Sequence, residues 1–183
     1  MESVLTQITI FADKAHGDQM RKYSADRYIV HPVRVMAAVK YCDNRLPMLV
    51  AALLHDVLED TPVTRDQMFD FLLSVMDPDD AEQTITLVVE MTDVYVKADY
   101  PQWNRQTRKE KELARIVTTS PDAQTIKYAD ILDNTTEIAA KDPNFAPRYL
   151  RECLVILTQA DKGNPRLRET ALHAVREALA GLR

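Results

Sequence analysis

Hydrophobic and polar positions along the chain fall into a series of helix-like segments that prolines separate. The first segment covers roughly residues 2–20, and a polar stretch over residues 21–27 follows it. Another helix is expected to start near His31-Pro32, where proline occupies a tolerated first-turn position. The remaining segments are predicted at about 47–60, 65–76, 78–94, 103–118, 121–140, 146–162 and 165–182.

Start and stop signals sharpen several of these predictions. Thr64 and Gln67 have the spacing of a capping box, so a helix should begin there and run to about Met76. Ser120 is the expected N-cap of a helix whose first residue is Pro121, and Asn164-Pro165 opens the last helix in the same way. Gly163 is the expected C-cap of the helix that begins near residue 146.

Composition agrees with an all-α fold. The chain has 183 residues, only 3 glycines, 46% hydrophobic residues and 28% charged residues, and helix-forming residues are common. That length can bury one substantial core, and no linker, repeat or low-complexity tract divides it. We therefore expect a single-domain helical bundle over residues 1–183.

Charge and cysteine content limit the partners. A net charge of -5 argues against a general nucleic-acid or membrane-surface binder, although a local basic patch could still bind a small polyanion. The N-terminal residues lack the basic start and apolar stretch of a secretory signal, and no apolar run is long enough to cross a membrane, so the expected location is cytoplasmic. Cys42 and Cys153 are too few and too far apart for a disulfide framework and are expected to be buried thiols.

The apolar segment from Leu49 to Leu58 contains the most informative residues of the chain. Within or directly after it stand His55, Asp56, Glu59 and Asp60. In one continuous helix, these four side chains would share an arc of roughly 140°, opposite an apolar docking face. Buried ionisable groups are tolerated mainly when they are paired or bind a metal, so the four residues are expected to serve a site.

A divalent metal held by imidazole and carboxylate needs three or four ligands from separate elements. His55 and Asp56 supply two, and the other candidates are His31 and Asp130. In its order and spacing, this set resembles the ligand pattern of the HD superfamily of metal-dependent phosphohydrolases.

Longer sequence blocks resemble the hydrolase domain of RelA/SpoT-type alarmone enzymes. The matching blocks are Gln19–Lys22, Tyr28–Pro32, Ala51–Thr61, and Ile126–Asp130 with Asn134. They cover a core of about residues 12–136 and leave the C-terminal helices, about 146–182, outside the motifs. The resemblance implies a stand-alone small alarmone hydrolase of the HD-domain type. It also implies one bound Mn²⁺ and removal of pyrophosphate from the 3′ position of guanosine tetra- or pentaphosphate.

The same resemblance assigns roles to further residues. Glu59 and Asp60 are the expected catalytic carboxylates. They stand one helical turn beyond His55 and Asp56 and could accept a proton from the attacking water. Cations are needed for the phosphates of the substrate, and Asn134 is expected to bind its nucleoside part. The candidate cations are Arg21, Lys22, Arg108 and Lys109.

Four positions depart from the alarmone-enzyme pattern, namely Asp93, Ile131, Asp133 and Glu137. They leave a second substrate class open: another 2′- or 3′-phosphorylated nucleotide, such as an adenosine alarmone or NADPH. A non-catalytic nucleotide sensor is a third alternative, against which Glu59 and Asp60 argue. The sequence leaves open whether the chain assembles into a homo-oligomer.

Overall fold

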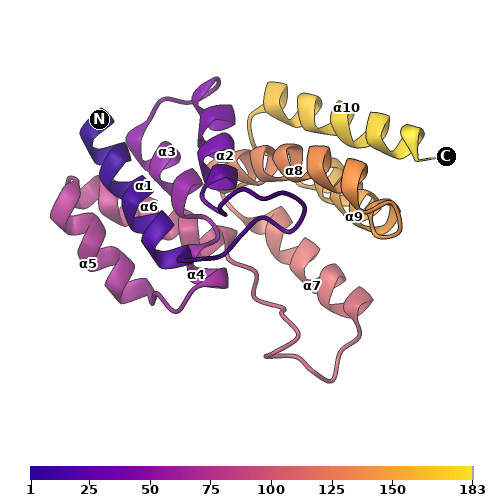
Figure 1. Cartoon of the computed structure of the whole chain (residues 1–183), viewed down its shortest axis with the longest axis horizontal. Coiled ribbons are helices and arrows are strands. Elements are labelled where there is room, and N and C mark those ends of the chain that lie inside the picture. Colours follow the sequence, from indigo (N-terminus) through magenta and orange to yellow (C-terminus); the bar gives the residue numbers. More distant parts are fainter. Residues whose placement is uncertain (183) are drawn as a thin grey trace. The chain divides into compact units, whose positions relative to one another are not determined.

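The computed structural model describes residues 1–182, and every regular element in that range is a helix, from α1 to α10 (Figure 1). The prediction of an all-α fold is therefore confirmed. The helices form two compact units, of which the first covers Met1–Thr92 and the second begins at Asp93. A single domain over residues 1–183 stays a prediction.

The first unit is built around α3. Its helices are α1 (Glu2–His16), α2 (Val30–Lys40), α3 (Leu46–Leu54), α4 (Val57–Asp60), α5 (Arg65–Val75) and α6 (Pro78–Met91). Helices α1, α2 and α6 all pack against α3, and every residue of α3 from Pro47 to Leu54 is buried. A helix that is apolar on all sides is stable in water only when neighbours surround it. The expectation that one face of this segment would be left for binding is therefore wrong for α3.

The first helix ends earlier than predicted, at His16 rather than near residue 20. Gly17 follows with a φ of 56°, a left-handed conformation that glycine adopts without the steric cost of a Cβ. Residues 17–29 then form the loop that joins α1 to α2 in Figure 1. Within this loop, Met20 and Arg27 face each other in an isolated antiparallel bridge.

The N-terminal cap predicted for the fifth helix is confirmed. The Thr64 side chain accepts a hydrogen bond from the Gln67 backbone N–H, and the Gln67 side chain accepts one from the Thr64 N–H. This reciprocal pair satisfies two donors that a helix start leaves without intrahelical partners. The helix that follows, α5, ends at Val75, within one residue of the prediction.

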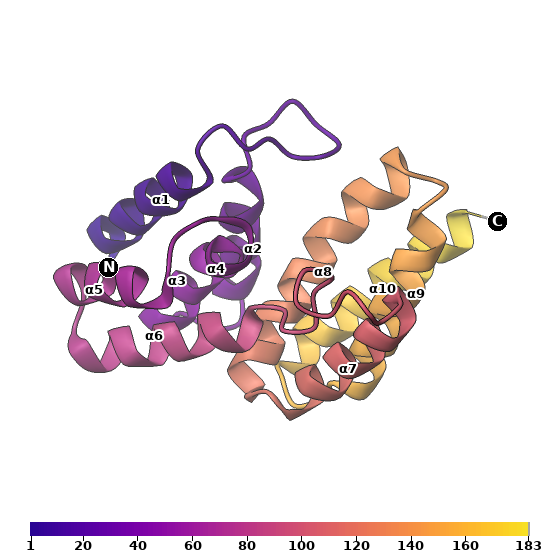
Figure 2. The same cartoon turned by 90° about the horizontal axis from the view of Figure 1, so that it is seen from below.

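The second unit contains α7 (Arg105–Thr118), α8 (Pro121–Lys141), α9 (Ala146–Gln159) and α10 (Pro165–Gly181). Helix α8 packs against α9 and α10, and α9 also packs against α7 (Figure 2). Two predicted caps are confirmed, since Ser120 accepts a hydrogen bond from Ala123 and Asn164 accepts one from Leu167.

Gly163 has a different role from the one predicted. Helix α9 ends at Gln159 with Ala160 as its C-cap, so Gly163 lies in the loop before α10. A Cβ at position 163 would stand 2.5 Å from Tyr128 Cε2 and 2.8 Å from the Thr125 backbone nitrogen. Glycine is needed here because the loop runs directly over α8, not because it caps a helix.

Among residues 1–182, no helix combines the length and the apolar character needed to cross a lipid bilayer.

Candidate functional site

The chain leaves regular helix at His55 and Asp56, between α3 and α4, so the single helix predicted for residues 47–60 is wrong. In a continuous helix, the Ala52 carbonyl would accept the backbone N–H of Asp56. Instead, His55 Nδ1 lies 2.8 Å from that carbonyl oxygen. The imidazole thus competes for the acceptor that would continue the helix, and the chain turns at the residues predicted to bind metal.

This turn brings three predicted ligands together in the first unit. His31 comes from the first turn of α2, which packs on α3, and its Nε2 lies 3.5 Å from Asp56 Oδ2. His55 Nε2 lies 3.1 Å from the same oxygen. Ligand atoms of His31, His55 and Asp56 all fall within 4.8 Å of one another. Both histidines are buried, with 1% and 2% of their surface exposed, whereas the Asp56 side chain keeps 21%.

The chemistry of this donor set fits a divalent metal. A backbone carbonyl can only accept, so the contact with Ala52 places a proton on His55 Nδ1. In the neutral form that metal ions bind, this imidazole directs its Nε2 lone pair toward the Asp56 carboxylate oxygen, and a cation next to both atoms would stabilise the pair. Two imidazoles and one carboxylate are ligands that divalent transition metals bind well.

Neighbouring side chains hold this group in place, and no individual role was predicted for Tyr28 or Gln19. Tyr28 Oη donates to Asp56 Oδ2 at 2.6 Å, which fixes the carboxylate. Gln19 connects His16 Nδ1 at 2.9 Å with Asp60 Oδ2 at 3.3 Å. His16 is buried at 7% exposure, and its Nε2 has no hydrogen-bond partner among the described residues.

Glu59 and Asp60 form the end of α4, directly beyond the turn, and Thr61 ends the helix as predicted. Both side chains are exposed and Asp56 is half-buried, so of the four ionisable residues expected to be buried in this segment only His55 is buried. Exposed carboxylates can exchange protons with solvent. Their catalytic role stays a prediction.

The loop between α1 and α2 carries the two cations predicted to bind phosphate. The Arg21 guanidinium lies 5.6 Å from the centre of the Tyr28 ring, a cation–π geometry. Lys22 is exposed, and its ammonium donates to Tyr23 Oη at 2.7 Å. Arg21 is therefore held beside a residue that contacts the ligand triad, whereas the hydrogen bond of Lys22 joins it to Tyr23, which is half-buried.

Asp130, the fourth predicted metal ligand, lies on α8 in the second unit. It is buried at 7% exposure; its Oδ2 accepts from Lys127 Nζ at 3.1 Å and its Oδ1 accepts from Asn134 Nδ2 at 2.6 Å. Asn134, the predicted nucleoside ligand, is thus one helical turn from Asp130 and bonded to it. That Asp130 completes the metal site stays a prediction.

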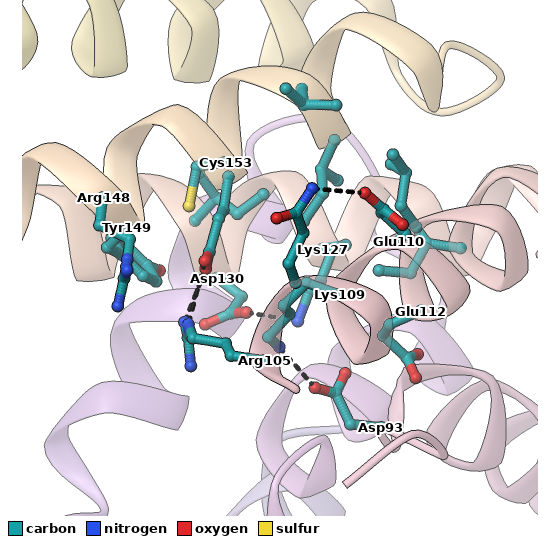
Figure 3. A pocket seen from close by; sticks show the side chains of 17 residues that line it. Asp93, Arg105, Lys109, Glu110, Glu112, Lys127, Asp130, Arg148, Tyr149 and Cys153 are labelled. Atoms are coloured by element: carbon teal, nitrogen blue, oxygen red, sulfur yellow. Dashed lines mark hydrogen bonds and ion pairs between the residues drawn. The ribbon is translucent and has the colours of Figure 1, made fainter. Parts of the chain in front are cut away.

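A pocket of about 390 Å³ lies within the second unit (Figure 3). Lys109 and Asp130 are among the residues that line it, and Arg108 is not. Arg108 instead donates to the Trp103 carbonyl at the start of α7. Of the two cations predicted on this helix, the structure therefore directs only Lys109 into the pocket.

Four basic and five acidic side chains line this pocket, together with apolar residues of α7, α8 and α9. Three of the basic side chains touch an acid of the same unit, as the dashed lines in Figure 3 show. These ion pairs are Arg105–Glu152 at 2.7 Å, Lys109–Asp93 at 3.0 Å and Lys127–Asp130 at 3.1 Å. Sequence spacing does not point to Arg105, because its partner Glu152 lies on another helix. It does not point to Lys127 either, because Lys127 and Asp130 on one helix look like an ordinary polar helix face.

Glu112, a buried acid with 2% exposure, anchors the loop at the start of this unit. Its Oε2 accepts the backbone N–H groups of Val94 and Tyr95, both at 3.0 Å, and its Oε1 pairs with Arg115. Asp93 is thereby held where it meets Lys109.

Burial also sets the thiol chemistry of the pocket. Removal from water raises the pKa of the Cys153 thiol to about 12, against an ordinary value of 9.0. The same cause raises the pKa of the neighbouring Tyr149 hydroxyl well above its usual range. Cys153 is buried as expected, whereas Cys42 is only half-buried, and burial is also the first cause that raises the pKa of its thiol.

No protein-family model matches the chain. Individual proteins do. It is 32% identical over 136 residues to the Drosophila melanogaster protein named guanosine-3′,5′-bis(diphosphate) 3′-pyrophosphohydrolase MESH1, a match that covers 73% of this chain and 68% of that protein. It is 30% identical over 151 residues to the Haemophilus influenzae guanosine-3′,5′-bis(diphosphate) 3′-pyrophosphohydrolase, covering 80% of this chain and 20% of the relative. The chain spans about a fifth of the length of such long bacterial relatives.

The fold has a solved counterpart over nearly all of its length. It is the structure reported as "A metazoan ortholog of SpoT hydrolyzes ppGpp and plays a role in starvation responses", with a TM-score of 0.76 and 25% sequence identity. The match covers 99% of this chain and 97% of that one. On the MESH1 match over most of both chains and this shared fold, the chain belongs to the family of guanosine-3′,5′-bis(diphosphate) 3′-pyrophosphohydrolases.

Proposed function

We propose that the chain hydrolyses the 3′-pyrophosphate of guanosine alarmones, converting the tetra- or pentaphosphate to GDP or GTP and pyrophosphate. One observation carries the proposal: His31, His55 and Asp56 offer ligand atoms within 4.8 Å of one another in a chain that belongs to this family. The reaction is a hydrolysis, so one water is consumed, the ribose 3′-oxygen regains a proton and pyrophosphate leaves.

The proposed cofactor is one Mn²⁺, held by the two imidazoles and the carboxylate, with Asp130 as the fourth protein ligand. A divalent ion in such a site lowers the pKa of a coordinated water and polarises a phosphate oxygen. The resulting mixture of nitrogen and oxygen ligands suits Mn²⁺ among other divalent metals, and Mn²⁺ is the ion that the family resemblance implies.

Glu59 and Asp60 are the proposed catalytic carboxylates. Both stand in the short helix that directly follows the ligand Asp56, so the turn that forms the triad also places them. Their exposed carboxylates can orient a water molecule, accept its proton and pass the proton to solvent. Gln19 donates to Asp60 Oδ2 at 3.3 Å, which limits the directions in which that carboxylate can turn.

The proposed substrate contacts are Arg21 and Lys22 in the first unit and Arg108, Lys109 and Asn134 in the second. Cationic side chains lower the free energy of a bound polyphosphate, and arginine can also stack on a purine. The proposed partner is a small nucleotide, and neither nucleic acid nor a membrane takes part in the proposed function. A cytoplasmic location stays a prediction, and whether the chain forms a homo-oligomer stays open.

Purified protein loaded with Mn²⁺ tests this function directly. It should release pyrophosphate from guanosine tetraphosphate, and His55→Ala and Asp56→Ala should each abolish release. His173→Ala is the matched control, because His173 is an exposed histidine in α10 of the second unit. Intact tetraphosphate after prolonged incubation with the metal-loaded protein would exclude the proposed substrate.

A panel of nucleotides separates the alternatives that the sequence left open. Cleavage of NADPH or of an adenosine alarmone, with the guanosine alarmone untouched, would keep the reaction class and replace the substrate. Binding of nucleotide and metal without release of phosphate or pyrophosphate would instead identify a sensor.

A further inference from the structure

Tyr28 contacts several parts of the candidate site, although the sequence motif that contains it suggested no role for this residue. Its hydroxyl donates to Asp56 Oδ2 at 2.6 Å, the same oxygen that lies 3.1 Å from His55 Nε2 and 3.5 Å from His31 Nε2. The Tyr28 hydroxyl thus donates to the oxygen that both histidines of the triad approach.

The position of this carboxylate needs outside support. Asp56 lies in the turn between α3 and α4, and its side chain is 21% exposed, whereas the two histidines are fixed by burial. A carboxylate can rotate about its Cβ–Cγ bond, so its oxygens sample several directions unless hydrogen bonds restrict them. Tyr28 supplies a short restriction, at a distance typical of strong O–H···O⁻ hydrogen bonds.

Tyr28 is itself held on both sides. Its backbone N–H donates to the Gln19 carbonyl at 3.0 Å, and its carbonyl accepts the His31 N–H at 3.0 Å. Its ring packs on the buried His16 ring with a centroid distance of 4.4 Å and meets the His31 ring edge-on at 5.9 Å. A fixed backbone and a fixed ring make the hydroxyl a rigid support.

The Tyr28 ring also lies beneath a predicted phosphate-binding cation. The Arg21 guanidinium stands 5.6 Å from the ring centre. The hydroxyl and the ring therefore face different groups, one of them a candidate metal ligand and the other a candidate substrate contact. These two contacts can be separated by substitution.

We propose that Tyr28 is a positioning residue that fixes Asp56 for the metal through its hydroxyl and holds Arg21 for the substrate through its ring. The inference rests on the proposed function and adds to it the residue that links metal binding with substrate binding. Outer-sphere hydrogen bonds to metal ligands typically change metal affinity or activity about 10- to 100-fold, which sets the expected size of the hydroxyl effect.

The test compares three variants of the full chain by Mn²⁺ titration, steady-state kinetics and thermal unfolding of the metal-free protein. Tyr28→Phe keeps the ring and should weaken Mn²⁺ binding about 10- to 100-fold, with the KM for guanosine tetraphosphate little changed once Mn²⁺ is saturating. Tyr28→Leu should weaken Mn²⁺ binding to the same extent and also raise KM by about 2- to 5-fold, as expected for a lost cation–π contact. Tyr23→Phe is the matched control, because that hydroxyl contacts the exposed Lys22, and it should leave the Mn²⁺ dissociation constant unchanged.

The outcomes separate this inference from the proposed function. If wild type and Tyr28→Phe bind Mn²⁺ equally well, the positioning role is overturned while the function stands. If Tyr28→Phe only lowers the unfolding temperature of the metal-free protein, the residue is structural and the role is again overturned. If the wild type binds Mn²⁺ but cleaves no alarmone, the proposed substrate fails and a weaker Mn²⁺ affinity of Tyr28→Phe still supports the role of the hydroxyl. If the wild type binds no Mn²⁺, both proposals fail.

Discussion

The two units present functional side chains in opposite ways. In the first unit, the apolar α3 ends in a turn where His31, His55 and Asp56 bring their ligand atoms together with both imidazoles buried. In the second unit, a pocket is lined by charged residues, and three of its cations are already paired with acids of the same unit. The first arrangement gathers electron-rich atoms that favour a cation, whereas the second is close to electrically balanced without a ligand.

The ion pairs of the second unit limit how strongly a polyphosphate could bind in its pocket. A phosphate that binds Arg105, Lys109 or Lys127 must compete with a carboxylate already within 3.1 Å. Each such exchange replaces one anion with another, so the net gain in free energy is small. The pocket is therefore better suited to orient a phosphate than to supply most of its binding affinity.

Truncation of one core leucine in each unit should have the largest effect on stability and should show which unit carries the metal site. Leu53→Ala and Leu150→Ala each remove a fully buried leucine, one from α3 and one from α9. Each should lower the free energy of unfolding by about 2–5 kcal/mol, measured by urea denaturation. Only Leu53→Ala should also weaken Mn²⁺ binding strongly, because Leu53 lies in the last turn of α3, two residues before His55. Equal losses of Mn²⁺ affinity in both variants would contradict a site built on α3.

A methyl group added at Gly163 should strain the second unit. The new Cβ would stand 2.5 Å from Tyr128 Cε2, and overpacking of this kind costs about 1–3 kcal/mol. Gly181→Ala is the control, since a Cβ there meets nothing within 4 Å. Thermal unfolding should show a lower midpoint for Gly163→Ala alone. Unchanged midpoints in both variants would show that the loop over α8 can move away freely.

Alkaline pH should destabilise the second unit through Cys153. Burial raises the pKa of this thiol to about 12, whereas an unfolded chain has an ordinary value of 9.0. The protonated thiol thus contributes stability that is complete below pH 9 and is lost as the pH rises toward 12; at pH 10 the loss is about 1 kcal/mol. The free energy of unfolding should therefore fall more steeply between pH 8 and 10 in wild type than in Cys153→Ala. Parallel slopes would contradict the buried, protonated thiol.

The smallest expected effect comes from freeing a pocket cation. Glu152→Gln removes the acid that pairs with Arg105 through two hydrogen bonds, at 3.0 and 2.7 Å. The pair is partly exposed, so the loss of stability should stay below about 1 kcal/mol. The KM for guanosine tetraphosphate should fall, because Arg105 becomes available to a phosphate without competition. A raised KM would show that the ion pair itself orients the pocket.

Sequence reasoning predicts local features of the fold well. The caps at Thr64, Ser120 and Asn164 are confirmed because each depends on residues within three positions of one another. The break at His55 is not predicted, because it arises from a side chain that takes a backbone acceptor rather than from proline or glycine. The predicted role of Gly163 is wrong for a related reason: its neighbours Tyr128 and Thr125 are far away in the sequence.

In the candidate site, too, features that are local in the sequence were predicted and contacts between distant elements were not. The sequence places His55 and Asp56 side by side, and a motif then points to His31, so residue order alone is enough to name three residues of the site. Tyr28, Gln19 and Glu112 act through contacts between elements, which no spacing rule reveals. Supporting residues are therefore the part of a site that depends most on three-dimensional packing.

The most direct test of the metal site is the stoichiometry of Mn²⁺ after equilibrium dialysis, measured by elemental analysis on wild type and on single alanine variants of the proposed ligands. We expect one Mn²⁺ per chain in wild type, essentially none in His31→Ala, His55→Ala or Asp56→Ala, and a reduced amount in Asp130→Ala. Retention of a full equivalent of Mn²⁺ by all three triad variants would contradict the central claim that these side chains hold a metal together.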